Sequence, residues 1–324
     1  MNIYLFDRPK YDRLYNCSVL SPAEWESKRH PNVLYFVFLS AMLKKKFWQH
    51  SCYKIMFVLG IYDVCVTVIG GTISSIFAIR GDIFCTNQII YIVGCVQAPF
   101  WCCCCVTGLI LLVNRAVDLI DGQYARALFG GSKTYVWFLI PFCMFLYTSF
   151  FTTPFMYNAI NDGGFLSPYA GVPEIKVDFS EYENQVVGNF NYFVTVIYPL
   201  MYLLLCVIIW YKTKGGQDRV SSTQKQIVAQ SVIVSTLLAF VSTAYIIMQY
   251  FEIPRFFIVA IQFMWMASHG ASVFTYIFVN KSMRKEAGKM VKEWLRCAKC
   301  ANEIPNLDSH QKSLTSQKPL PHVV

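Results

Sequence analysis

Long apolar runs separated by short polar stretches dominate the chain. Six of them are long enough, with few charges, for an α-helix to cross a hydrocarbon core about 30 Å thick, which takes roughly 20 residues. The predicted spans are Ile55–Ile79, Gln88–Val113, Tyr135–Tyr157, Phe190–Tyr211, Ile227–Phe251 and Phe256–Val279. The pattern therefore predicts an all-α fold, a polytopic membrane helix bundle.

A shorter apolar stretch, Val33–Leu43, precedes these spans and is followed by three lysines at 44–46. As a helix it reaches about 17 Å at 1.5 Å per residue, well short of the hydrocarbon core. It either crosses with local thinning of the bilayer, or it fails to cross and leaves the N-terminus in the cytoplasm. The mismatch penalty favours poor or partial insertion, so we expect a bundle with a shortened first helix.

Beyond the last span, apolar residues recur every three or four positions between Lys and Arg. They are Met283, Ala287, Met290, Val291, Trp294 and Leu295. This spacing is typical of a helix lying in the cytoplasmic interface, and a simple basic stop-transfer tail is the alternative. The expected organisation is an N-terminal segment at 1–32, the helix bundle at 33–279, an amphipathic cytoplasmic helix at 280–300 and a disordered tail at 301–324.

Composition agrees with a membrane protein, because 55% of the 324 residues are hydrophobic and 15% are charged. The net charge of +9 does not indicate nucleic acid, since Lys and Arg flank apolar runs instead of filling a polar domain. The loops that connect the spans are alternately rich and poor in Lys and Arg. The poor set contains Arg80, Lys176 and Arg255. This asymmetry places the tail in the cytoplasm and the 157–189 loop outside.

Two ionisable residues lie within predicted spans, Asp63 and His269. A carboxylate in hydrocarbon costs about 3 kcal/mol on insertion scales unless it faces other helices or water, so Asp63 should point into the bundle. It serves either as a structural hydrogen-bond hub or in an ion-linked or switch role. His269 is expected to be a neutral group that hydrogen-bonds between helices, and direct contact with a ligand is the alternative. Asn114 and Arg115 end the second of the six long spans, followed by Asp118, and an arginine there can simply extend to the interface.

Most of the 13 cysteines lie in apolar runs, where free thiols act as small hydrophobic side chains. Cys102–Cys105 radiate about 100° apart on a helix and cannot converge on one ion, and the Cys297 and Cys300 pair lacks the second ligand pair of a zinc site. We therefore predict no metal and no cofactor, and Cys297 and Cys300 are either palmitoylated or unmodified. The sequence contains no metalloprotease, P-loop or nucleophile-elbow motif, so an enzyme is not expected.

The sequence resembles the nematode serpentine receptors of class T over residues 15–295. The matching residues are Tyr15–Ser18, Ser21, Glu24, Trp25, His50–Asp63, Phe84, Cys85, Asn114, Arg115, Asp118, His269, Gly270 and Asn280–Arg284. This resemblance implies a rhodopsin-like seven-helix bundle with an extracellular or mid-membrane ligand pocket and a cytoplasmic face that engages a heterotrimeric G protein. It further implies a multi-pass protein of the plasma membrane in sensory cilia, with a small environmental or pheromone-like ligand.

By position, Asp63 is similar to the second-helix aspartate of such receptors, Arg115 to the arginine that contacts the G protein, and Tyr276 to the tyrosine of the switch in the last span. The sequence departs from the pattern at Ser272 and Val273, which replace the Asn and Pro of that switch, and at Asn114, which replaces an acidic residue.

Cys17 and Cys85 are the cysteines expected on the outer side, and we predict a disulfide between them. Asn16 begins an N-x-S sequon that is usable only when the N-terminus is extracellular.

Two alternatives to a chemoreceptor remain open. One is a membrane-inserted but non-signalling paralogue with a truncated first helix. The other is a small-molecule transporter, for which inverted repeats and paired interrupted helices would be expected, and the sequence shows neither.

Overall fold

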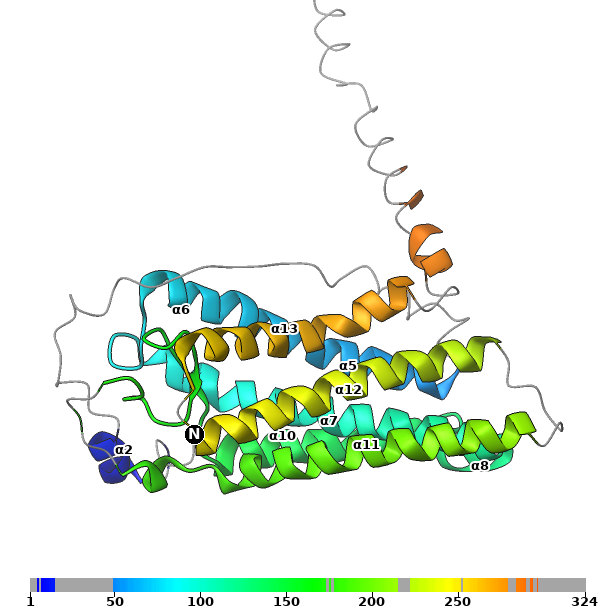
Figure 1. The fold of residues 1–324 in the computed structure, drawn as a ribbon, viewed down its shortest axis with the longest axis horizontal. Helices are drawn as coiled ribbons and strands as arrows, with labels where there is room; N and C mark the ends of the chain where they lie inside the picture. The colour runs from blue at the N-terminus through cyan, green and yellow to red at the C-terminus, as the bar shows by residue number, and fades with distance from the viewer. Residues whose placement is uncertain are drawn as a thin grey trace, which may run out of the picture.

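The computed structural model describes residues 5, 7–14, 49–172, 175, 178–214, 222–251, 253–278, 284–289, 292–293 and 296. The predicted short span Val33–Leu43, the Asn16 sequon, Cys17, Cys297 and Cys300 lie outside these residues, and so does most of the predicted tail. The described part is a bundle of long helices (Figure 1).

The first long helical segment contains α5 (Ser51–Val66), a π-helix η2 (Thr67–Ile73) and α6 (Ser74–Arg80) without interruption. It confirms the predicted helical run at 55–79 and starts one turn earlier. Gly81 ends the segment with a φ of 66°, the left-handed conformation that a glycine adopts without a steric penalty.

The longest helix, α7 (Ile89–Ile120), packs against α5, α10, α11 and α12 and forms the centre of the bundle. It continues about two turns beyond the predicted end at Val113. Asn114, Arg115 and Asp118 therefore lie on the helix itself and do not follow it. Cys102, Cys103, Cys104 and Cys105 are all buried along α7.

After α7, the short helix α8 (Gly122–Phe129) begins at Asp121, whose side chain accepts a hydrogen bond from the Gln123 amide at 2.7 Å. Helices α9 (Lys133–Trp137) and α10 (Leu139–Phe151) then form the next run. The prediction that this span reaches Tyr157 is wrong. Thr152 is extended, and Thr153 precedes Pro154, a position that disfavours helix, so the helix ends at Phe151.

Residues 156–165 form an antiparallel hairpin of β1 (Met156–Asn158) and β2 (Gly163–Phe165), with Tyr157 opposite Gly164. The hairpin packs in a second hydrophobic cluster that includes Tyr11 of α2 (Arg8–Leu14). Burial, and then the carboxylate of Asp162, raises the pKa of Tyr157, so its phenol keeps its proton. A 3-10 turn, η3 (Phe179–Tyr182), follows the hairpin.

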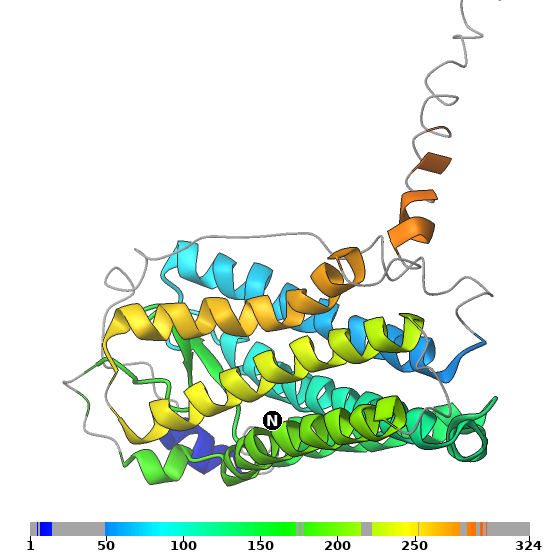
Figure 2. The same ribbon diagram turned by 45° about the vertical axis from the view of Figure 1, so that its right-hand side comes forward.

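Three further helices complete the described bundle: α11 (Gln185–Lys214), α12 (Ser222–Tyr250) and α13 (Arg255–Phe278). Consecutive members pack side by side, as Figure 2 shows. Their bounds confirm the last three predicted helical runs. Residues 284–289 are also helical, and Ala287 packs in the main core.

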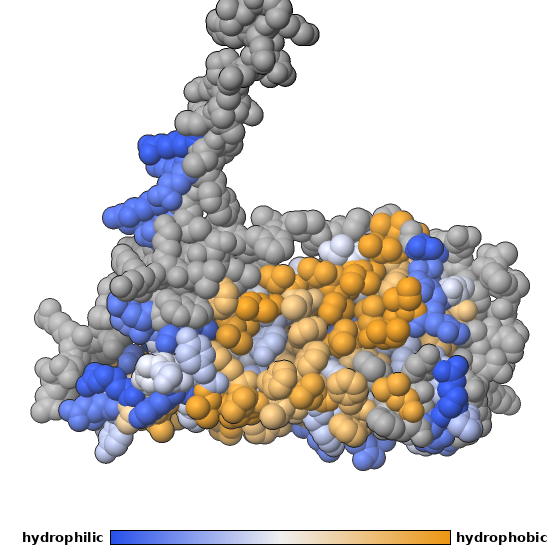
Figure 3. Space-filling view, turned by 180° about the vertical axis from the view of Figure 1, so that it is seen from behind, coloured by the Kyte–Doolittle hydropathy of each residue, from blue (hydrophilic) through white to orange (hydrophobic). Residues whose placement is uncertain are grey.

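The bundle exposes apolar side chains on its flank and keeps polar side chains inside. A broad apolar band crosses the middle of the molecule, with hydrophilic residues gathered at both ends (Figure 3). Val196, Leu203 and Phe263 are 60%, 57% and 64% exposed. Among the described residues, four helical segments are long and apolar enough to cross a membrane: Ser51–Arg80, Ile89–Ile120, Lys133–Phe151 and Gln185–Lys212. Such a surface is stable in lipid, and the fold is a polytopic membrane helix bundle.

Candidate functional site

A buried polar cluster lies where α5, α7 and α13 meet. Asp63 of α5 and His269 of α13 are 3% and 1% exposed, and the imidazole Nδ1 lies 2.8 Å from Asp63 Oδ1. The thiol of Cys104 on α7 donates to the same carboxylate oxygen at 3.6 Å. An ionisable group inside a membrane bundle requires such partners, because lipid offers none. The cluster therefore joins three helices through one carboxylate.

Two tryptophans enclose the His269 ring. The rings of Trp101 and Trp265 meet it edge to face, with centroid distances of 5.6 and 5.3 Å. The indole nitrogen of Trp101 donates to Asn191 Oδ1 of α11 at 3.0 Å, and the hydroxyl of Ser242 on α12 donates to the Asn191 carbonyl at 2.7 Å. Ring contacts and hydrogen bonds thus connect the cluster, through Trp101, to α11 and α12.

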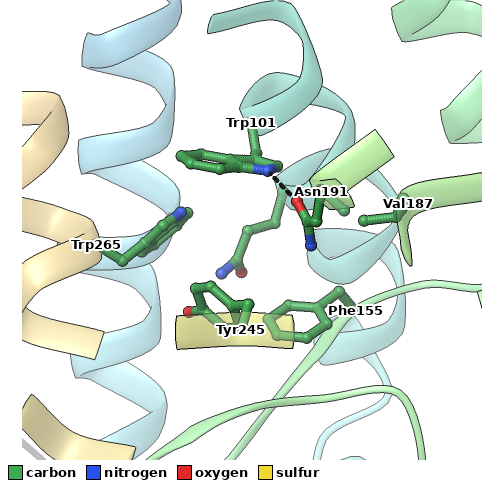
Figure 4. Close-up of a pocket in the computed structure, with 8 residues that line it drawn as sticks. Trp101, Phe155, Val187, Asn191, Tyr245 and Trp265 are labelled. Carbon is green, nitrogen blue, oxygen red and sulfur yellow. Dashed lines mark hydrogen bonds between the residues drawn. The ribbon is translucent and has the colours of Figure 1, made fainter. Parts of the chain in front are cut away.

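A small cavity of about 40 Å³ opens next to these tryptophans. Figure 4 shows Trp101, Phe155, Val187, Asn191, Tyr245 and Trp265 around it, and Gln97 and Ala98 complete the lining. Gln97 is 2% exposed, and its Oε1 has no hydrogen-bond partner among the described residues. Since a buried amide oxygen is normally hydrogen-bonded, it is suited to accept from a water or a ligand in this cavity.

A larger pocket of about 690 Å³ lies at the end of the bundle that carries β1, β2 and η3, which we call the hairpin end. Its lining includes aromatic side chains such as Tyr182 and Tyr192, polar side chains from 180–189, and parts of β2. Phe155 and Tyr245 line both this pocket and the small cavity, and their rings meet edge to face at 5.7 Å. This aromatic pair therefore separates the outer pocket from the inner cavity.

The opposite end of the bundle, which carries α8, has a pocket of about 540 Å³. Arg115 lines it but is only 6% exposed. Its guanidinium donates to the side chains of Asn114 and Asp118, the latter at 3.4 Å, while the Asn114 amide donates to Ser51 of α5 at 3.1 Å. In this arrangement Arg115 is held by two side chains of its own helix, and Asn114 connects it to Ser51 of α5.

The structure brings together some of the residues that the sequence singled out. Asp63 and His269, considered separately from sequence, are in direct contact. Tyr276 lies on α13, but its side chain is outside the described part. Cys85 packs against the cluster around the hairpin. Its predicted disulfide partner is outside the described residues, so that pairing stays a prediction.

Sequence reasoning missed Cys104, Trp101, Trp265 and Asn191. The thiols of the cysteine run do point in different directions: Cys103 donates to the Pro141 carbonyl of α10, whereas Cys104 reaches Asp63. Asn191 and Gln97 offered a usable signal, because an amide inside an apolar run has to find a partner or line a cavity.

Buried polar contacts through the middle of a membrane bundle, with a pocket at each end, are features of a multi-pass membrane receptor. The profile of the family described as serpentine type 7TM GPCR chemoreceptor Srt matches residues 9–299, so the chain belongs to this family. It is also 23% identical over 292 residues to serpentine receptor class T-55 of Caenorhabditis elegans, an alignment that covers 84% of this chain and 78% of the relative. The family is one of receptors and not of enzymes.

Proposed function

We propose that this protein is a chemoreceptor that binds a small molecule at the hairpin end and activates a heterotrimeric G protein at the α8 end. We place it in the plasma membrane, in the sensory cilia of chemosensory neurons. Family membership supports the receptor class. The two pockets at opposite ends of one bundle support a division into a ligand face and a coupling face.

Charge supports the orientation in which the α8 end is cytoplasmic. The described basic residues at that end include Lys54, Arg126 and Lys133, together with Lys212 and Lys214 at the end of α11. The hairpin end presents Arg80 and Arg255, of which Arg255 is paired with Asp162, together with Arg8, Lys10 and Arg13 of α2. The α8 end carries more, because Lys225 of α12 and Lys285 and Lys289 beyond α13 add to its basic residues. Basic residues favour the cytoplasmic side, so ligand would enter from outside.

The hairpin-end pocket supports a small-molecule ligand. Its volume of about 690 Å³ is in the range of small-molecule sites, which are typically about 300–1,000 Å³. Its lining combines aromatic surface with amides and hydroxyls, and such a lining fits a ligand with an apolar body and a few polar groups. Beneath the Phe155 and Tyr245 pair, the inner cavity of about 40 Å³ accepts only a few atoms of a ligand or water.

The observation that carries the coupling proposal is the setting of Arg115. A buried guanidinium in the last turns of α7, held by Asn114 and Asp118 beside an open pocket, can be released by a small movement of α7 against α5. We infer that the structure is a resting state in which these contacts keep Arg115 from the G protein. Ligand binding at the other end would shift the population toward a state with Arg115 exposed.

The test is ligand-dependent signalling in a heterologous cell, read as calcium or cyclic-nucleotide changes across a panel of small volatile and water-soluble molecules. Arg115→Ala should abolish the response while surface expression is retained. Arg126→Ala is the matched control, because Arg126 lines the same pocket but is exposed. It should keep most of the response.

Three results would contradict the proposal. Unchanged signalling by Arg115→Ala would reduce Arg115 to an anchor at the interface. Ligand-driven solute flux in vesicles, without any G-protein response, would indicate a transporter. A chain that reaches the surface and responds to no ligand in cells with several G proteins would indicate the non-signalling paralogue.

A further inference from the structure

We propose that Asp63, Cys104 and His269 form a binding site for a borderline-soft divalent metal ion, with Zn²⁺ as the best fit. The site goes beyond the proposed receptor function and does not depend on it. The three side chains come from α5, α7 and α13, and their potential ligand atoms all lie within 4.8 Å of one another. All three are buried.

The spacing is close to that of a tetrahedral zinc centre. With Zn–S of about 2.3 Å and Zn–N and Zn–O of about 2.0–2.1 Å, ligand atoms in a tetrahedral site lie about 3.3–3.6 Å apart. Asp63 Oδ1 lies 2.8 Å from His269 Nδ1 and 3.6 Å from Cys104 Sγ. Shifts of about 1 Å or less, within the reach of side-chain torsions, would admit the ion.

The donor types select the metal. A thiolate, an imidazole and a carboxylate together suit Zn²⁺ and Co²⁺, whereas Na⁺, Mg²⁺ and Ca²⁺ prefer sets of oxygen ligands. Three protein ligands leave a fourth position for water or another small donor.

Charge balance also favours an ion at this depth. The neutral form of the cluster carries a protonated Cys104 thiol and one proton between Asp63 and His269. Zn²⁺ replaces those two protons, which leave to solvent, and its two positive charges balance the thiolate and the carboxylate. The exchange therefore places no net charge in the low-dielectric interior, where an unbalanced charge is costly.

The surroundings connect the site to the small cavity. Trp101 and Trp265 both touch His269 and both line that cavity, so the two indoles lie between the cavity and the site. A bound ion would tie α5, α7 and α13 together. We expect it to raise the thermal stability of the bundle and to resist any movement of these helices relative to one another.

The experiment uses the full chain purified in detergent, carrying Cys297→Ser and Cys300→Ser so that the tail pair cannot bind metal. Co²⁺ is the probe, because tetrahedral Co²⁺ gives strong visible d–d bands and a thiolate ligand adds a charge-transfer band. We expect both bands on titration, their loss when Zn²⁺ is added, and a higher unfolding temperature with Zn²⁺.

Cys104→Ser should remove the charge-transfer band and weaken binding at least 10-fold, because even second-shell changes at metal sites cost 10–100-fold. Cys103→Ser is the matched control: it is the neighbouring buried cysteine, and its thiol points to Pro141 instead. It should bind like the parent. His269→Asn gives a second ligand deletion if Cys104→Ser does not fold, as judged by gel filtration and tryptophan fluorescence.

The proposal is overturned if the parent shows no tetrahedral Co²⁺ spectrum at millimolar Co²⁺, or if Cys104→Ser and His269→Asn bind as tightly as Cys103→Ser. Because binding is measured without ligand or G protein, its failure leaves the receptor proposal standing, and a failed signalling assay leaves the metal site standing.

Discussion

Gly70 lies in the π-helix η2 against the indole of Trp265, and this contact predicts that Gly70→Ala destabilises the bundle. A Cβ added at Gly70 would overlap the six-membered ring and lie 2.5 Å from its Cη2, where ordinary carbon contacts are about 3.5–4.0 Å. Trp265 is 4% exposed and packs edge to face on His269 at 5.3 Å, so the ring has little freedom to move. Gly70→Ala therefore overpacks the core, which costs about 1–3 kcal/mol.

Gly71→Ala is the matched control in the same π-helix. Its added Cβ would meet Met266 Sδ and Thr67 Cγ2 at 3.8 Å, ordinary van der Waals contact. The gain of about 0.5–1 kcal/mol for replacing a helical glycine with alanine applies to both variants and cancels in their difference. The two variants should then differ in their free energy of unfolding by the cost of the overlap with Trp265 alone, about 1–3 kcal/mol.

The assay is thermal unfolding in detergent followed by intrinsic tryptophan fluorescence, at one heating rate for both variants because unfolding of membrane proteins is often irreversible. At about 2–4 °C per kcal/mol for chains of 150–250 residues, Gly70→Ala should unfold at least about 2 °C below Gly71→Ala. Equal unfolding temperatures, or a more stable Gly70→Ala, would refute the packing of Trp265 against η2.

Three further predictions concern the polar core and the N-terminus. His269→Ala should lower the free energy of unfolding by up to about 3–5 kcal/mol, because it removes the imidazole beside the buried Asp63 carboxylate. Adding Asp63→Asn to that variant should restore part of the lost stability. If it restores none, the loss comes from packing and not from the unpaired carboxylate. Asn16 should carry an endoglycosidase-sensitive glycan, because Tyr11 of α2 packs in the hairpin cluster and places the N-terminal segment at the end of the bundle that we assign to the outside, although the length of the segment at 33–43 alone favours poor insertion. An unglycosylated Asn16 would contradict this orientation. In the fraction that does cross, Cys17 and Cys85 should form a disulfide, and non-reducing mass spectrometry that finds both as free thiols would remove it.

The helices of the bundle could be predicted from the sequence because lipid imposes long apolar runs, and six such runs became six helical segments. The hairpin could not, since Met156 and Tyr157 continue the apolar pattern of α10. The signals that the sequence does carry are Pro154, which follows the end of the helix, and the turn dipeptide Asp162-Gly163, where Asp162 adopts a φ of 50°. Composition alone does not distinguish two apolar strand residues from one more turn of helix.

The candidate site was predictable only in part. Asp63 was expected to face the bundle because a carboxylate in lipid is costly, and the structure buries it. Its contact with Cys104 and His269 depends on how α5, α7 and α13 are rotated about their axes, which no local pattern fixes. The buried setting of Arg115 was missed for a related reason: α7 extends beyond its apolar run, so the arginine lies inside the helix and not at its end.

The most direct test of the central claim is nucleotide exchange on a G protein by the purified chain in lipid nanodiscs. With an active small molecule found in the cell assay, the account predicts ligand-dependent acceleration of GTP uptake by at least one class of Gα subunit, and its loss in Arg115→Ala. Ligand binding at the hairpin end without acceleration on any class of Gα subunit would contradict it.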